Sequence, residues 1–166
     1  MSRLDSAIRR LQAQRSCIDD AARRVEGLPG IVLELGLGNG RTYDHLRERL
    51  PEREIYVFER RVAAHPDCIP PDDRLILGDV RETLPAALER LRGQVALVHA
   101  DVGTGDVETN RVLAEAISAV VGDFLVPGGY LVCDQQITFP GAEPVPLPDG
   151  VAPGRYIYLR KPEKAG

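Results

Sequence analysis

Residues 31–41 read Ile-Val-Leu-Glu-Leu-Gly-Leu-Gly-Asn-Gly-Arg, a short apolar run that ends in three alternating glycines. Glycine adopts positive φ at no steric cost and lets a backbone approach a ligand closely. The stretch predicts a strand that turns through Gly36, Gly38 and Gly40 into a helix whose first amides face the same point. Because ligands of open α/β sheets bind at the carboxyl ends of strands, this turn is the expected centre of a binding site.

The glycine spacing differs from that of two common nucleotide-binding motifs. A dinucleotide fingerprint needs G-x-G-x-x-G, but Arg41 stands where the third glycine belongs and Gly40 comes one place early. A P-loop ends in Gly-Lys-Ser or Gly-Lys-Thr, and the chain contains neither tripeptide. The spacing therefore disfavours a nicotinamide oxidoreductase and excludes a P-loop nucleotide hydrolase.

On the C-terminal side of this turn, short apolar runs alternate with helical patterns. Strands are predicted at 31–35, 55–58, 75–77, 95–98, 130–133 and 156–159, and helices at 41–50, 82–92 and 107–121. Strands covered on both faces are continuously apolar. Strand–helix alternation of this kind indicates an α/β protein with a doubly wound, mostly parallel, Rossmann-like sheet, and we expect residues 1–166 to form a single domain.

The two ends of the chain differ from this alternation. Residues 3–27 form an amphipathic pattern that predicts a helix packed on the core. Its apolar stripe consists of Leu4, Ile8, Leu11, Ile18 and Val25. Residues 136–154 are rich in proline and glycine and predict a loop in place of a helix, followed by only one strand. A sheet truncated after its fifth strand leaves an open edge, which favours a homo-oligomer.

The overall composition narrows the class of protein further. The net charge of −4 disfavours a nucleic-acid binder, which usually carries a basic face. No apolar run is long enough to span a membrane, and the N-terminus lacks the apolar core of a signal peptide, so we expect a cytoplasmic protein with no membrane partner. Cys17, Cys68 and Cys133 lie far apart in no CxxC arrangement, which disfavours disulfides and structural zinc.

The pattern Glu34-x-Gly-x-Gly-x-Gly40 resembles motif I of the class I S-adenosylmethionine-dependent methyltransferases. Other features follow in the order typical of that superfamily. They are Glu59 after the second strand, Gly78-Asp79-Val80 after the third, His99-Ala100-Asp101 after the fourth and Pro127-Gly128-Gly129 before the fifth. The resemblance covers about residues 30–135 and implies the class I methyltransferase fold with S-adenosylmethionine as the cofactor.

The resemblance also implies roles for individual residues. The expected cofactor-binding residues are Glu34, Gly36, Gly38, Asn39, Phe58, Glu59, Arg60, Gly78, Asp79, Val80 and His99. Among them, Glu34 and the glycine turn would hold the methionine end, Glu59 the ribose hydroxyls and Asp79 the adenine amino group. His99 or Asp101 is the expected catalytic group, which would orient or deprotonate an acceptor. Asn39 and Arg41 would either touch the ligand or shape the turn.

The polar residues after the fourth and fifth strands allow further interpretations. They are similar to a segment of the cation-dependent O-methyltransferases, in which case His99, Asp134 and Gln135 would hold Mg²⁺ or Ca²⁺. Imidazole replaces a carboxylate poorly on a hard cation, so we expect no metal. The cluster could instead be a polar rim facing the substrate, or Asp101 could cap the helix that starts near Val107.

These features predict an S-adenosylmethionine-dependent methyltransferase that acts on a small-molecule acceptor, whose identity the sequence does not give. The alternative is a non-catalytic protein that binds S-adenosylmethionine as a sensor or partner subunit. A clear catalytic motif and a lid over the substrate are both missing, and these absences favour the alternative.

Overall fold

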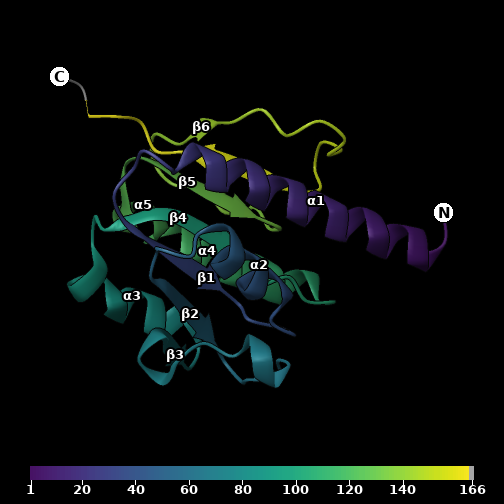
Figure 1. Ribbon diagram of the computed structural model, residues 1–166, viewed down its shortest axis with the longest axis horizontal. Helices are drawn as coiled ribbons and strands as arrows, with labels where there is room; N and C mark the ends of the chain where they lie inside the picture. Colours follow the sequence, from purple (N-terminus) through teal and green to yellow (C-terminus); the bar gives the residue numbers. More distant parts are fainter. Residues whose placement is uncertain (165–166) are drawn as a thin grey trace.

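Seven strands form one sheet in the order β3-β2-β1-β4-β5-β7-β6 in the computed structural model, which describes residues 1–164 (Figure 1). The strands are β1 (Ile31–Leu35), β2 (Ile55–Glu59), β3 (Leu75–Leu77), β4 (Val95–Ala100), β5 (Leu125–Cys133), β6 (Glu143–Pro144) and β7 (Ile157–Arg160). Strands β1 to β5 pair in parallel, whereas β7 is antiparallel to both β5 and β6. The predicted doubly wound, mostly parallel sheet is confirmed.

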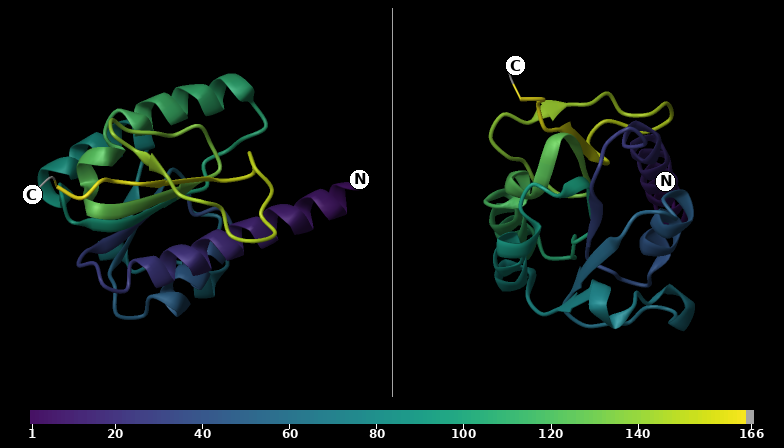
Figure 2. Two further views of the ribbon diagram at one scale, coloured as in Figure 1. Left: turned by 90° about the horizontal axis from the view of Figure 1, so that it is seen from above. Right: turned by 60° about the vertical axis from the view of Figure 1, so that its left-hand side comes forward.

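Helices cover both faces of this sheet (Figure 2). They are α1 (Arg3–Arg24), α2 (Arg41–Arg49), α3 (Val80–Leu91), α4 (Val107–Ser118) and α5 (Val121–Phe124), with short 3₁₀ turns η1 (Pro66–Cys68) and η2 (Asp72–Arg74) between β2 and β3. One core cluster lies under α1 and α2, and the other lies under α3, α4 and α5. The side chains of each strand alternate between these two clusters, so the strands are apolar along their whole length.

Helix α1 lies along the sheet only over its C-terminal half. Its first turn is fixed by a capping box, in which Ser2 and Asp5 each accept a hydrogen bond from the backbone amide of the other. Ile18 is buried, but Leu4 is 68% exposed because the N-terminal half extends past the body of the molecule (Figure 1). The expectation that the whole apolar stripe packs on the core is therefore wrong for Leu4, Ile8 and Leu11, which are all exposed.

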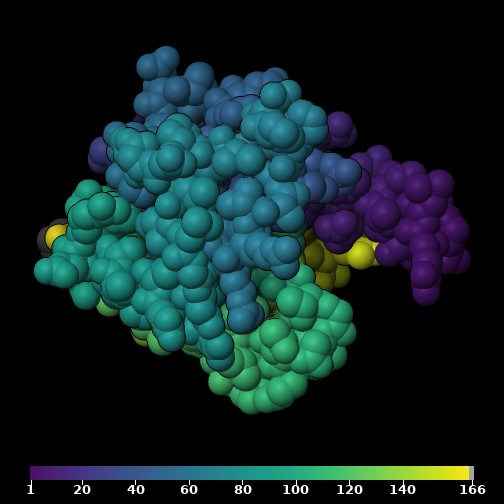
Figure 3. All heavy atoms as spheres, turned by 90° about the horizontal axis from the view of Figure 1, so that it is seen from below, coloured from purple at the N-terminus to yellow at the C-terminus, as the bar shows by residue number. Residues whose placement is uncertain are grey.

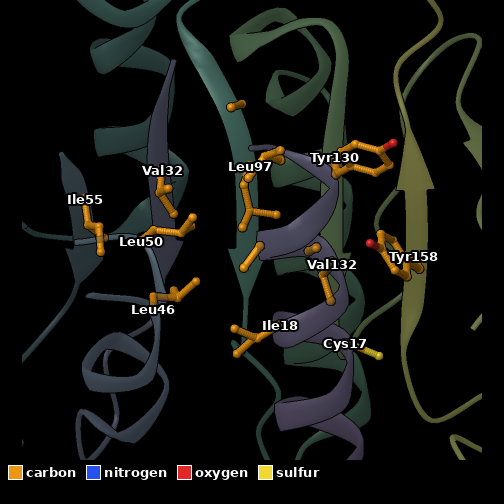
Figure 4. Packing of buried hydrophobic residues seen from close by; sticks show 14 of the residues in the cluster. Cys17, Ile18, Val32, Leu46, Leu50, Ile55, Leu97, Tyr130, Val132 and Tyr158 are labelled. Atoms are coloured by element: carbon orange, nitrogen blue, oxygen red, sulfur yellow. The ribbon is translucent and has the colours of Figure 1, made fainter. Parts of the chain in front are cut away.

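The core beneath α1 and α2 shows why the sequence is apolar there. Figure 4 shows Cys17 and Ile18 of α1, with Val32, Leu97 and Val132 from three neighbouring strands. At the edge of this cluster the rings of Tyr130 and Tyr158 meet edge to face, with centroids 5.9 Å apart.

Within residues 1–164, no helix has both the length and the apolar character needed to cross a membrane.

The chain after β5 contains the main departure from the predicted elements. Residues 136–154 form no helix, as expected, but Glu143–Pro144 makes a two-residue strand, β6, that the sequence pattern does not predict. Strand β6 pairs with β7, so an antiparallel pair completes the sheet where only one strand was expected. Two residues are too few to show the period-two alternation that marks a strand.

Candidate functional site

A cleft of about 590 Å³ opens at the carboxyl ends of β1, β2, β3 and β4. Eight of the expected cofactor-binding residues line it, namely Gly36, Gly38, Phe58, Glu59, Arg60, Gly78, Asp79 and Val80. Helix α4 forms the opposite wall, and its segment stands out in green beside the blue and teal segments in Figure 3. The volume lies within the usual range of about 300–1,000 Å³ for small-molecule sites. Residues from several strand ends thus meet in one cleft, as the parallel sheet requires.

Part of the cleft lining is not predicted from the sequence. The further residues are Arg81, Asp101 (expected as catalytic), Val102, Gly103, Thr104, Glu108, Thr109, Val112 and Leu113. Most of them belong to α4 or to the loop that precedes it, where no motif marks a ligand contact. Only the position of α4 over the strand ends could reveal them.

The glycine turn after β1 needs glycine for two physical reasons. Gly36 and Gly38 have φ of +87° and +54°, in the left-handed region that other residues rarely adopt. A Cβ atom at Gly36 would lie 2.5 Å from the backbone oxygen of Asp101, whereas a Cβ atom at Gly38 would meet nothing within 4 Å. Gly36 therefore allows β1 and β4 to approach closely, and Gly38 keeps the backbone open to the cleft.

Glu59 ties this turn to the end of β2. Its Oε2 atom accepts hydrogen bonds from the amides of Leu37 and Gly38, at 2.7 and 3.1 Å. Its Oε1 atom accepts from the amides of Arg60 and Arg61, at 2.7 and 3.2 Å. The Glu59 carboxylate is thus held at the wall of the cleft, and it also fixes the shape of the glycine turn. This second role is not predicted from the sequence.

Asp79 combines a structural role with a place in the cleft. It is the N-cap of α3 and accepts a hydrogen bond of 2.9 Å from the amide of Arg81, and both of its oxygens accept from the Arg81 guanidinium. These hydrogen bonds lower the pKa of Asp79 to about 2, so the carboxyl is ionised at neutral pH. The helix cap and the expected ligand contact are compatible, because the same carboxylate lines the cleft.

Glu34 and His99 lie outside the cleft, contrary to the roles expected for them. They are opposite each other in the β1–β4 register, and both side chains are fully buried beneath the α1 side of the sheet. His99 Nδ1 lies 2.6 Å from Glu34 Oε1, and His99 Nε2 lies 3.2 Å from the hydroxyl of Tyr156. Because alternate residues of a strand point to opposite faces, the side chain of His99 is directed into the core rather than toward a ligand.

The pKa values of both members of the buried pair are raised. Burial raises the pKa of Glu34 against the opposing effect of His99. Burial lowers the pKa of His99, but the charge and hydrogen bond of Glu34 outweigh it and leave the pKa raised. Both ring nitrogens are engaged, and among residues 1–164 no three His, Cys, Asp or Glu side chains are placed to hold a metal ion. A cation bound by His99, Asp134 and Gln135 would have to displace a hydrogen bond that a His99 ring nitrogen already makes.

Asp101 comes directly after β4 and, unlike His99, reaches the cleft. It lines the cleft and accepts a hydrogen bond of 2.6 Å from Gln14 of α1. Its neighbour Asp134 accepts from the amide of Gly103 at 3.1 Å, and burial together with the charge of Asp101 raises the pKa of Asp134 to about 6. The alternative role of Asp101 as a helix cap is wrong, because Asp106 caps α4.

A second cavity of about 260 Å³ lies between α1 and the glycine turn. It is lined by Arg10, Leu11, Gln14, Leu37, Asn39, Arg41 and Thr42, and it shares Gly36, Gly38, Asp101 and Gly103 with the larger cleft. Asn39, expected in the cofactor site, lies in this cavity. The contribution of α1 was missed, since Gln14 is 87 positions away from Asp101 in the sequence.

Comparisons with known proteins agree with this geometry. The model of a family described as S-adenosyl-L-methionine methyltransferase matches residues 1–161. The crystal structure of an S-adenosyl-L-methionine methyl transferase from Silicibacter pomeroyi DSS-3 shares 50% sequence identity, with a TM-score of 0.91 over 97% of this chain and 99% of that chain. No curated protein matches the chain.

More distant structures share the fold alone. The sugar N-methyltransferase KedS8 from Streptoalloteichus sp ATCC 53650 is 16% identical, with a TM-score of 0.61 over 92% of this chain and 87% of that chain. The amino pentose methyltransferase CalS10 from Micromonospora echinaspora, solved with S-adenosylmethionine bound, is 20% identical, with a TM-score of 0.52 over 89% of this chain and 65% of that chain.

Proposed function

Because the chain belongs to the S-adenosyl-L-methionine methyltransferase family, we propose that its larger cleft binds this cofactor and that it methylates a small-molecule acceptor. The observation that carries the assignment of the cleft is the convergence of Gly36, Glu59 and Asp79, from three different strand ends, on one cavity. When bound, the cofactor supplies an electrophilic methyl group on a sulfonium. The chain must then hold the cofactor, orient an acceptor and exclude competing water.

The residues of the cleft fit the parts of such a cofactor. Glu59 places carboxylate oxygens at the cleft wall, where ribose hydroxyls would share them with the backbone amides that already donate to them. Asp79 offers an ionised acceptor for an amino group. Phe58 and Val80 add apolar groups to the lining of the same cleft. The absence of a side chain at Gly38 leaves room for a ligand against the backbone, because nothing lies within 4 Å of the position a Cβ would take.

Asp101 is the residue we propose for orienting or deprotonating the acceptor. It is the only carboxylate among residues 1–164 that lines both the cleft and the smaller cavity. The hydrogen bond from Gln14 fixes its position. The same role for His99 does not fit, since its side chain is fully buried and bonded to Glu34.

Calorimetric titration with S-adenosylhomocysteine, the demethylated product, tests the assignment of the cleft. Glu59→Gln is expected to weaken binding about tenfold, because hydrogen bonds to charged groups contribute about 1.5–3 kcal/mol. Glu52→Gln, an exposed change outside both cavities, is the matched control and is expected to bind as the unmodified protein does. Failure of the unmodified protein to bind S-adenosylhomocysteine would refute the proposal. Transfer of a labelled methyl group to a panel of small acceptors then identifies the substrate.

We also propose that residues 1–166 act as one domain that forms a homo-oligomer. Leu4, Ile8 and Leu11 expose apolar surface on the projecting half of α1, and such surface usually marks a contact site. Light scattering after size-exclusion chromatography is expected to give a mass above 18.2 kDa, and Ile8→Asp is expected to lower that mass. A monomer at all concentrations would refute this part of the proposal.

A further inference from the structure

The smaller cavity contains charged groups that do not line the larger cleft. Arg10 of α1 and Arg41 at the start of α2 both line it. Among residues 1–164, neither guanidinium forms an ion pair, whereas Arg23 and Arg24 of α1 and Arg47 and Arg49 of α2 each do. Two exposed, unpaired guanidinium groups beside one small cavity form a site for an anion.

The remaining lining does not neutralise this charge. Asp101 is the only acidic residue that lines the cavity within the described chain, and Gln14 already hydrogen-bonds to it. Helix α2 also begins here. Its N-cap, Gly40, has no side chain, although Asn39 Oδ1 accepts a hydrogen bond of 3.3 Å from the amide of Arg41. The lining is therefore net positive in a protein whose total charge is −4, and a cleft lined by one sign of charge concentrates ligands of the opposite sign.

Under the proposed function, the neighbouring cofactor is a second source of positive charge, and its one carboxylate is its only anionic group. S-adenosylmethionine carries a sulfonium and an ammonium against a single carboxylate, so it is itself net positive. Under the proposed assignment, its methionine end would lie against the glycine turn, whose Gly36 and Gly38 line both cavities. Like charges at close range repel one another, most strongly where water is excluded. An anion between the two would remove this repulsion.

We propose that the smaller cavity is the acceptor site and that it takes a small acceptor carrying a carboxylate or phosphate group. This inference rests on the proposed function, and it specifies the class of acceptor. Arg10 and Arg41 hold the anionic group, and guanidinium matches the geometry of both oxyanions. The nucleophilic end of the acceptor then faces Asp101, which borders the larger cleft. A volume of about 260 Å³ restricts the acceptor to a small molecule.

Anion binding can be measured without turnover. Inorganic phosphate and labelled acetate are titrated separately, followed by phosphorus and carbon NMR line broadening, with and without saturating S-adenosylhomocysteine. Arg10→Gln is expected to weaken anion binding about tenfold, as expected for loss of a charge-assisted hydrogen bond. Arg9→Gln is the matched control, because Arg9 is the adjacent exposed arginine of α1 and lies outside the cavity. The phosphate and acetate arms show which oxyanion the site prefers.

The same variants separate this inference from the proposed function. Loss of anion binding in Arg10→Gln, with unchanged affinity for S-adenosylhomocysteine, supports an acceptor site. If Arg10→Gln instead weakens S-adenosylhomocysteine binding tenfold and anion binding does not depend on Arg10, the cavity serves the methionine end and the inference is overturned. If S-adenosylhomocysteine does not bind at all, the proposed function fails, whereas Arg10-dependent phosphate binding would still identify an anion site.

Discussion

Replacement of His99 by leucine is expected to lower the free energy of unfolding strongly and to leave cofactor affinity nearly unchanged. The imidazole is fully buried and lies 2.6 Å from the carboxylate of Glu34, which is also fully buried. Glu34 Oε2 accepts no hydrogen bond from the described residues. Removal of His99 therefore leaves Glu34 fully buried without the partner of its Oε1 atom.

The magnitude follows from the burial of both groups. Removal of one member of a buried ion pair lowers the free energy of unfolding by about 3–5 kcal/mol, because the remaining charge is uncompensated. Glu34→Gln keeps an acceptor for the ring of His99 and removes the charge, so its cost is expected to be about 1–2 kcal/mol. In the Glu34→Gln background, His99→Leu leaves a neutral amide, and its cost is expected to fall to about 1–3 kcal/mol. The coupling between the two positions is therefore expected to be about 2 kcal/mol.

Urea denaturation of the two single variants and the double variant measures this coupling. His45→Leu is the matched control, because His45 lies 2.8 Å from Asp19 but remains partly exposed, with 23% of its side chain accessible. Its cost is expected to be below about 1 kcal/mol. S-adenosylhomocysteine affinity is measured on each folded variant, and a change within about threefold is expected for His99→Leu. A cost of His99→Leu no larger than that of His45→Leu, or strictly additive effects of Glu34→Gln and His99→Leu, would refute the reasoning.

Other properties of the chain can be tested in the same assays. Gly36→Ala is expected to lower the free energy of unfolding by at least about 2 kcal/mol, because the residue has φ +87° and its Cβ atom would lie 2.5 Å from a backbone oxygen. In the control Gly27→Ala the new Cβ atom meets nothing within 4 Å, so the free energy of unfolding should change by less than about 0.5 kcal/mol. Thermal unfolding measures both variants, and equal effects would contradict the steric argument. Asp79→Ser keeps a good helix cap but loses the carboxylate. Calorimetry is expected to show about tenfold weaker S-adenosylhomocysteine binding, while the free energy of unfolding falls by less than about 1 kcal/mol. Unchanged affinity would show that Asp79 does not contact the cofactor. The pKa of His99 is raised in the folded state. The stability that His99 contributes is therefore fully present below its unfolded-state pKa, near 6.5, and is lost as the pH rises through its folded-state pKa. Urea denaturation at a series of pH values is expected to show this decline, and an equal decline in Glu34→Gln would mean that other groups cause it.

The sequence predicted the strand ends well, because the relevant signals are local. An apolar run followed by Gly36 and Gly38 specifies a strand and an open turn within a few residues. Once the strands are known to be parallel, their carboxyl ends must share one edge of the sheet. Glu59 and Asp79 are therefore close to the glycine turn in the structure although they are far from it in the chain.

The sequence predicted the elements after β5 less completely. Proline and glycine indicate correctly that residues 136–154 form no helix. They give no sign of strand β6, since a two-residue strand depends on pairing with β7 rather than on its own residues. Likewise, the apolar stripe of α1 identifies one face of a helix but does not show how far the sheet extends beneath it, so Leu4 and Ile8 are exposed.

The direction of individual side chains was decided by tertiary structure. The sequence by itself determined the doubly wound sheet, the glycine turn and the carboxylates at the strand ends, because hydrophobic period and turn chemistry act over a few residues. Only the β1–β4 register made Glu34 and His99 partners, and only the packing of α1 brought Arg10 and Gln14 to the glycine turn. Such contacts depend on which surfaces pack together across the whole fold, and no local pattern encodes that choice.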